Sequence, residues 1–180
     1  MEYVSDFFLL CACAIEEIRS LIAWLYKNAI TDIAVAGVSK GGYIAVVAGA
    51  VSQLPVSVAA LVAPINGIAV FIDGLTGKLC DWRTLQATAP AYGSAEKRMR
   101  EIFEATSIER IAHPNHKKMI VIGARKDKFV PLMYHQLLGR HWEETEVRWL
   151  HGGHVSSILE RMHFLSAITS CFDPETCQSV

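Results

Sequence analysis

Three side chains of this sequence, Ser39, Asp127 and His154, are of the types that transfer an acyl group through a covalent serine intermediate. A serine hydroxyl becomes nucleophilic when a histidine takes its proton, and a carboxylate holds that histidine in the required tautomer. Ser39 lies in the sequence Gly-Val-Ser-Lys-Gly at residues 37–41, which is a Gly-x-Ser-x-Gly motif. An apolar run precedes the motif and an Ala/Val-rich segment follows it, which is the strand-turn-helix context of a nucleophile elbow.

The motif at residues 37–41 also has a purely structural interpretation. It can form a tight strand-to-helix turn in which Ser39 caps the helix, because a serine side chain often accepts a hydrogen bond from the first helical turn. The flanking glycines fit both interpretations, since they allow a strand and a helix to pack closely. The chemical interpretation therefore depends on a histidine and a carboxylate at the same edge of the fold.

The apolar pattern predicts an α/β fold, a mainly parallel sheet with helices on both faces. Short apolar runs that suit buried strands alternate with longer segments whose apolar residues recur every three or four positions. The expected strands span residues 33–36, 56–62, 118–124 and 146–150, and the expected helices span residues 4–27, 42–51, 94–111, 131 onwards and 155–170. Ser39, Asp127 and His154 each follow one of these strands, at the edge where the loops of a parallel sheet converge.

Both expected partners of the serine have alternatives. Asp127 lies in a charged loop and could be a solvated turn residue, whereas Asp73 and Asp81 could supply the acid from a less regular segment. His154 could cap a helix or pack in the core, and His151 is a rival base three residues earlier. We prefer His154 because the two glycines before it give its loop the freedom to place an imidazole over the sheet edge.

Two histidine pairs raise the question of a metal site. They are His113-x-x-His116 and His151-x-x-His154, and neither is accompanied by a third well-placed ligand. A catalytic zinc site needs three protein ligands, so we expect no metal and no other cofactor.

Composition indicates one domain without a nucleic-acid partner. At 180 residues the chain is long enough to bury a substantial core, and its hydrophobic fraction of 52% suits a buried parallel sheet. A formal net charge of −1 gives no field that would attract nucleic acid or an anionic membrane. Residues 67–93 have poor periodicity, and we interpret them as a lid-like excursion above the sheet or as a plain connection with one or two short helices.

The cysteines indicate reduced thiols and thus an intracellular location. They are odd in number and irregularly spaced, so they fit neither a disulfide framework nor a paired zinc pattern. Nothing basic precedes the apolar stretch at residues 7–15, which argues against a signal peptide, and the stretch is too short to span a bilayer. The five cysteines are Cys11, Cys13, Cys80, Cys171 and Cys177.

The motifs resemble those of the C-terminal catalytic half of the α/β-hydrolase superfamily. The order serine, aspartate, histidine is the order expected of that superfamily. The resemblance is carried by residues 37–42, by Gly123, Asp127 and Val130-Pro131, and by Gly152-Gly153-His154. Residues 4–8, 37–42, 81–83 and 148–156 are similar, more closely, to the α/β-hydrolase domain-containing protein 18 group, and the similarity covers nearly the whole chain.

The resemblance implies a role for each site residue. Ser39 would be the nucleophile, His154 the base and Asp127 its orienting acid, and the backbone N–H of Lys40 would be one oxyanion donor. Lys40 stands where this group usually has methionine, which changes the surroundings of the nucleophile but leaves the backbone donor. The second oxyanion donor should come from a loop after an earlier strand, which has no counterpart here.

The sequence thus predicts a serine hydrolase acting on carboxylic esters, lipid acyl esters among them, through an acyl-enzyme. Because the first half of the fold has no counterpart, we expect the chain to be a fragment of a longer hydrolase domain. The alternative is a catalytically silent binding or scaffold protein whose open sheet edge is completed by a partner chain.

Overall fold

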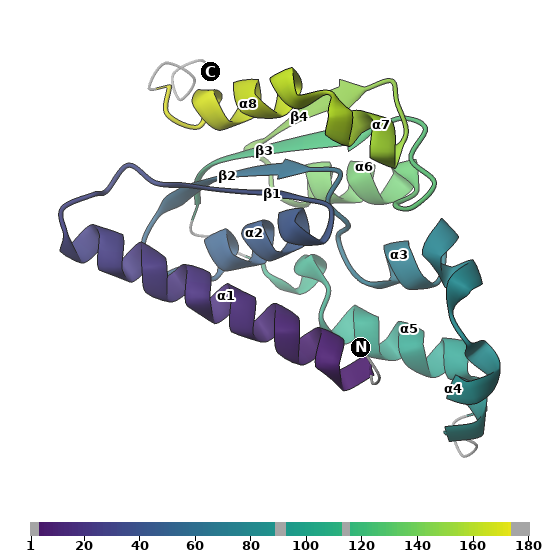
Figure 1. Ribbon diagram of the computed structural model, residues 1–180. Helices are drawn as coiled ribbons and strands as arrows, with labels where there is room; N and C mark the ends of the chain where they lie inside the picture. The colour runs from purple at the N-terminus through teal and green to yellow at the C-terminus, as the bar shows by residue number, and fades with distance from the viewer. Residues whose placement is uncertain (1–3, 89–92, 113–115, 174–180) are drawn as a thin grey trace.

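The computed structural model describes residues 4–88, 93–112 and 116–173. Its centre is a four-stranded, fully parallel sheet with the strand order β1-β2-β3-β4 (Figure 1). The strands are β1 (Ala34–Val38), β2 (Val56–Leu61), β3 (His116–Ala124) and β4 (Thr145–Leu150). All four expected strands are therefore present, with ends that differ from the expected ones by at most two residues.

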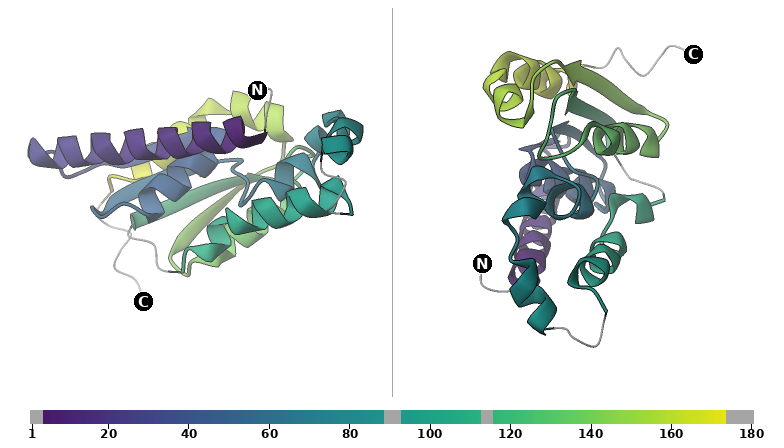
Figure 2. Two further views of the ribbon diagram at one scale, coloured as in Figure 1. Left: turned by 90° about the horizontal axis from the view of Figure 1, so that it is seen from below. Right: turned by 90° about the vertical axis from the view of Figure 1, so that its right-hand side faces the viewer.

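Helices cover both faces of the sheet, as expected. The strands have the same order in the sheet as in the sequence. Right-handed crossovers between such strands place the connecting helices on one face of the sheet. On that face α2 (Lys40–Ala50) packs on β1 and β2, and α6 (Leu132–His141) packs on β3 and β4. The long first helix, α1 (Val4–Lys27), packs against α2 farther from the sheet, and α8 (Arg161–Ser170) packs on β2 from the opposite face (Figures 1 and 2).

The two central strands explain the apolar composition, because they are buried on both faces. All six residues of β2 are buried, and successive residues point to opposite sides of the sheet. Val58 of β2 contributes to the core under α2 and α6, whereas Ala59 and Leu61 contribute to the core under α8. The edge strand β1 is only partly buried, and its Ala36 is exposed.

Residues 67–93 contain more helix than expected. Their described part forms α3 (Ile68–Phe71), a 3-10 helix η1 (Leu75–Leu79) and α4 (Trp82–Thr88), and these elements lie beyond the carboxyl ends of the strands (Figure 1). The Asp73 carboxylate accepts hydrogen bonds from the Tyr134 hydroxyl and the Arg100 guanidinium. The N–H of Leu75 donates to the carbonyl of Lys128 at 2.8 Å. The first part of the segment is thus tied to the loop after β3, and its role as a lid remains a prediction.

Two expected helices differ in their ends. The helix expected over residues 94–111 is α5 (Ala95–Ala105), capped by the Ser94 side chain, and a short 3-10 helix η3 (Ile108–Arg110) follows it. The single helix expected over residues 155–170 is wrong, because the chain breaks at Glu160 into α7 (His154–Leu159) and α8.

The helical spacing of the apolar residues Ile158, Met162, Leu165 and Ile168 predicts one inner face for residues 155–170, and the break at Glu160 divides that face. Met162 and Leu165 are 75% and 53% exposed, whereas Ile168 packs against the buried core. Ala167 and Cys171 are buried against the sheet instead. The break changes the helical phase, and a small alanine side chain allows α8 to approach the strands closely.

Two observations on the described part of the chain concern the membrane and the thiols. None of its helices is both long enough and apolar enough to span a membrane. Its four cysteines, at positions 11, 13, 80 and 171, are free thiols, and Cys177 lies outside the described residues.

Close packing of α2 on β2 yields a stability prediction. A Cβ atom added at Gly49 would lie 2.4 Å from Cγ2 of the buried Val58. Gly49→Ala should therefore lower the free energy of unfolding by about 1–3 kcal/mol, as overpacked cores do, measured by urea denaturation. Gly41→Ala in the same helix is the control, since its Cβ would meet nothing within 4 Å. Equal stabilities for the two variants would contradict the prediction.

Candidate active site

Ser39 occupies a strained turn between β1 and α2. Its φ of 54° and ψ of −119° lie in a region that residues with a side chain rarely adopt. The turn is tight, because a Cβ atom at Gly37 would lie 2.1 Å from the carbonyl oxygen of Gly41. Ser39 stands at the N-cap position of α2, but its side chain makes no capping hydrogen bond. The structural interpretation of Ser39 as a helix cap therefore does not account for its side chain.

The Ser39 hydroxyl instead contacts the expected histidine. Nε2 of His154 lies 2.9 Å from Oγ of Ser39, and Nδ1 of His154 lies 2.7 Å from Oδ2 of Asp127. These residues come from the loops after β1, β3 and β4, which meet at the carboxyl edge of the sheet. The structure thus brings the three residues singled out in the sequence into one hydrogen-bonded chain.

The Asp127 carboxylate is buried and held by four donors. Oδ1 accepts hydrogen bonds from the N–H groups of Phe129 and Val130 at 2.8 and 2.9 Å. Oδ2 lies within hydrogen-bond distance of both His154 and His135, the latter through Nε2 at 3.2 Å. Burial alone would raise the pKa of Asp127, but the hydrogen bonds from His135, His154 and Val130 hold this pKa well below its usual range. The site therefore keeps Asp127 ionised.

His154 is the first residue of α7, and the two glycines before it serve a different purpose from the one expected. The N–H of Gly153 donates to Oγ of Ser156 at 2.8 Å, and the carbonyl of Gly152 accepts from the N–H of Lys126 at 3.0 Å. A Cβ at Gly152 would lie 2.5 Å from Oγ of Ser156. The glycines thus allow close packing rather than loop freedom. The Phe129 ring packs against the imidazole of His154, with ring centroids 5.3 Å apart.

The rival residues lie outside this hydrogen-bonded chain. Asp73 binds Tyr134 and Arg100, as described above. Asp81 accepts hydrogen bonds from the backbone and side chain of Thr84. Each rival acid therefore has a local structural role. His151 is exposed, and His154 occupies the position expected of the base.

Lys40 is the first residue of α2, directly after Ser39. The N–H groups of the first helical turn have no acceptor within the helix. The N–H of Lys40 is therefore not used in a helical hydrogen bond. The Lys40 side chain is exposed. Among the described residues no strand precedes β1. The loop from which a second oxyanion donor is expected is therefore not among them.

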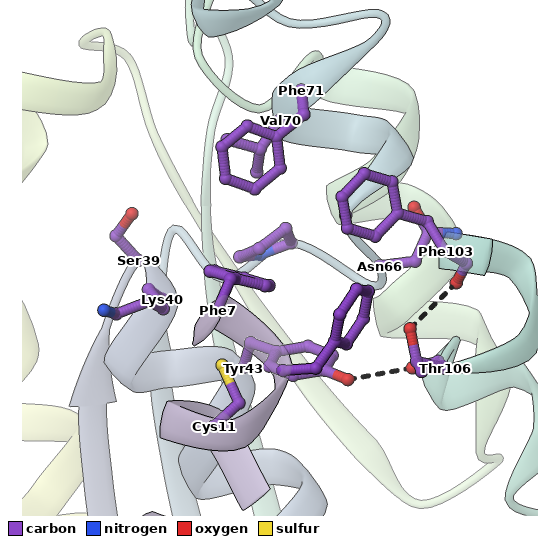
Figure 3. A pocket seen from close by; sticks show the side chains of 13 residues that line it. Phe7, Cys11, Ser39, Lys40, Tyr43, Asn66, Val70, Phe71, Phe103 and Thr106 are labelled. Atoms are coloured by element: carbon purple, nitrogen blue, oxygen red, sulfur yellow. Dashed lines mark hydrogen bonds between the residues drawn. The ribbon is translucent and has the colours of Figure 1, made fainter. Parts of the chain in front are cut away.

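An apolar pocket opens beside Ser39 (Figure 3). Its wall is made largely of aromatic side chains from helices that are distant in sequence, and the rings of Phe7, Phe71 and Phe103 contact one another. Tyr43 of α2 completes one side and donates a hydrogen bond from its hydroxyl to the carbonyl of Thr106 at 2.8 Å. The pocket suits an apolar group of a ligand bound beside Ser39.

Sequence reasoning missed His135 and the pocket. His135 follows Asp127 by eight residues and resembles any other polar residue of an amphipathic helix, so the pattern gives no signal for it. The pocket residues are separated by up to about a hundred positions, and only the packing of α1, α3 and α5 brings them together.

No group of three or more potential metal ligands occurs among the residues that the structure describes. His113, from the first histidine pair, lies outside those residues. In the second pair, both ring nitrogens of His154 contact protein side chains, Nδ1 on Asp127 and Nε2 on Ser39.

The parallel sheet and the serine at the turn after β1 define an α/β hydrolase fold. The family model for alpha/beta hydrolase domain containing 18 matches residues 1–94 and 88–174. The chain therefore belongs to the alpha/beta hydrolase domain containing 18 family.

Solved structures of other α/β hydrolases have the same fold. The esterase Pf2001 of Pyrococcus furiosus has a TM-score of 0.61 and 19% identity, over 87% of this chain and 60% of the esterase. The enol-lactonase of Burkholderia xenovorans has a TM-score of 0.55 and 14% identity, over 87% of this chain and 72% of the lactonase. The chain thus spans about three fifths of the esterase's length. No curated protein sequence matches it.

The buried Asp127 leads to a prediction on pH and stability. Asp127→Asn should lower the free energy of unfolding at pH 7 by about 3 kcal/mol, because it disrupts a buried, hydrogen-bonded ion. A carboxyl group whose pKa is lowered by folding stabilises the protein above its unfolded pKa of about 3.9. That contribution is lost as the pH falls further. The difference between parent and variant in urea unfolding should therefore shrink from pH 5 to pH 3. A difference independent of pH would contradict the prediction.

Proposed function

We propose that this chain carries the catalytic triad of a serine hydrolase that acts on carboxylic esters. The observation that carries the proposal is the continuous hydrogen-bonded chain from Ser39 through His154 to Asp127. The strained backbone of Ser39 supports it, since this conformation is typical of a nucleophile elbow. Membership of the family and the esterase and lactonase of similar fold agree with the proposal.

The proposed mechanism follows from the tautomer that Asp127 selects. When Nδ1 of His154 carries the hydrogen and donates a hydrogen bond to Asp127, Nε2 is unprotonated. It can then take the proton of the Ser39 hydroxyl as Oγ attacks the carbonyl carbon of the ester. The tetrahedral oxyanion would accept a hydrogen bond from the N–H of Lys40. His154 then gives this proton to the leaving alcohol as the C–O bond of the ester breaks, which leaves an acyl-enzyme at Ser39. A water activated by His154 would then hydrolyse it and release the acid.

The apolar pocket favours esters with a hydrocarbon acyl group. Its lining of phenylalanine rings, with Val70 and Pro64, offers few polar partners to a ligand. Each methylene group moved from water into such a pocket contributes about 0.8 kcal/mol. We therefore place the acyl chain there, and lipid acyl esters are among the substrates that this lining suits.

One observation favours a second candidate function, a silent binding or scaffold protein. Strand β1 pairs only with β2 among the described residues, which leaves its other edge open. Large apolar side chains on α1 are also exposed, Trp24 by 57% and Leu21 by 55%. An open strand edge is a site for strand addition by another chain, and exposed apolar groups can add to such an interface.

Labelling with a fluorophosphonate probe tests the catalytic proposal. The parent chain should be labelled, and Ser39→Ala and His154→Ala should abolish labelling while both variants stay folded. Ser5→Ala, at an exposed serine of α1, should label like the parent. A folded parent chain that is not labelled would overturn the proposal and favour the scaffold function.

Turnover of p-nitrophenyl esters of increasing chain length tests the proposed acyl pocket. We expect kcat/KM to rise about fourfold for each added methylene from acetate to butyrate, because about 0.8 kcal/mol of burial is gained per group. Phe71→Ala should flatten this dependence, since it removes one wall of the pocket. An equal slope in Phe71→Ala and the parent would place the acyl chain elsewhere.

A further inference from the structure

A second histidine, His135, contacts the same carboxylate oxygen as the proposed catalytic base. Its Nε2 lies 3.2 Å from Oδ2 of Asp127, the atom that Nδ1 of His154 approaches at 2.7 Å. The side chains of His135 and Asp127 are both fully buried, at 0% exposure. Asp127 is thus flanked by two imidazoles, of which only His154 contacts Ser39.

The surroundings of His135 fix its tautomer. Its Nδ1 is buried and has no hydrogen-bond partner among the residues that the structure describes. Because Oδ2 of an ionised carboxylate only accepts hydrogen bonds, the Nε2 of His135 carries the hydrogen. His135 is therefore a hydrogen-bond donor to Asp127 through Nε2.

The backbone around His135 holds this donor in place. His135 lies in the first half of α6, which begins directly after the loop whose N–H groups bind Oδ1 of Asp127. The helix packs on β3 at Gly123, where a Cβ atom would lie only 3.0 Å from Cβ of His135. The adjacent Tyr134 is hydrogen-bonded to Asp73. These contacts leave the imidazole little freedom to turn away from Oδ2.

The unpartnered nitrogen indicates what the histidine contributes. A buried polar atom without a partner costs about 1–3 kcal/mol, and an apolar ring of similar shape would avoid that cost. Packing alone therefore does not explain a histidine at this position. The hydrogen bond that Nε2 donates to a charged oxygen is the interaction that an apolar ring would lack.

We propose that His135 is a positioning residue, a buried hydrogen-bond donor that fixes Oδ2 of Asp127 in the orientation needed to receive Nδ1 of His154. With Oδ1 held by two backbone N–H groups and Oδ2 by His135, the carboxylate cannot rotate about its Cβ–Cγ bond. His154 then meets an acceptor that is already oriented. This inference rests on the proposed hydrolase function, because the orientation of His154 affects the rate only if His154 acts as the base.

Three variants test this role. His135→Phe removes the donor, and it should lower the rate constant of fluorophosphonate labelling about tenfold, in line with the loss of one hydrogen bond to a charged group. His135→Gln keeps an N–H donor at a similar reach, and it should recover most of the rate. His141→Phe is the matched control, because His141 lies in the same helix and its described contacts, the carbonyl of Ile111 at 3.0 Å and the ring of Trp142, do not include Asp127. It should label at the parental rate. Urea denaturation of all three variants separates labelling from folding.

The outcomes distinguish this inference from the proposed function. Equal rates for the parent and a folded His135→Phe variant would overturn the positioning role, as would equally slow rates for His135→Phe and His135→Gln. An unlabelled parent would overturn the proposed function instead. In that case NMR of the histidine side chains tests the positioning role of His135 independently of labelling. The downfield Nδ1 proton of His154 should be observed in the parent and in His135→Gln and be lost in His135→Phe, and its presence in all three would overturn the inference.

Discussion

The site depends on the hydrogen bonds that hold the buried carboxylate of Asp127. An ion taken out of water is unfavourable unless donors replace its hydration, and here four N–H groups from three segments do so. Those donors come from the loop after β3, from α6 and from the start of α7, so the carboxylate joins three segments at one point. His154 is the first residue of α7, and its hydrogen bond to Asp127 holds its other ring nitrogen against Ser39.

Much of the fold and of the site could be predicted from the sequence, because both depend on local signals. The apolar runs that form β2 and β3 are buried on both faces, and Ser39, Asp127 and His154 follow strands directly. What could not be predicted depends on contacts between distant segments. The break at Glu160 has no glycine or proline to mark it, and the aromatic pocket exists only where three helices meet.

Strand β1 has one open edge among the described residues. The chain spans 60% of the esterase of Pyrococcus furiosus that it resembles in fold, and β1 is an edge strand within the described residues. Ser39, Asp127 and His154 nevertheless all lie directly beyond the carboxyl ends of β1, β3 and β4. The three groups are therefore held together without contributions from beyond that edge.

The aromatic pocket and the hydrogen-bonded chain meet only at Ser39, and they are built by different parts of the fold. The chain of hydrogen bonds rests on strand ends, whereas the pocket wall rests on helices α1, α3 and α5, which lie farther from the sheet. A sideways shift of α1, which carries Phe7, would widen or narrow the pocket without moving His154 or Asp127. The width of the pocket therefore depends on helix packing, whereas the hydrogen bonds among Ser39, His154 and Asp127 depend on the strand ends.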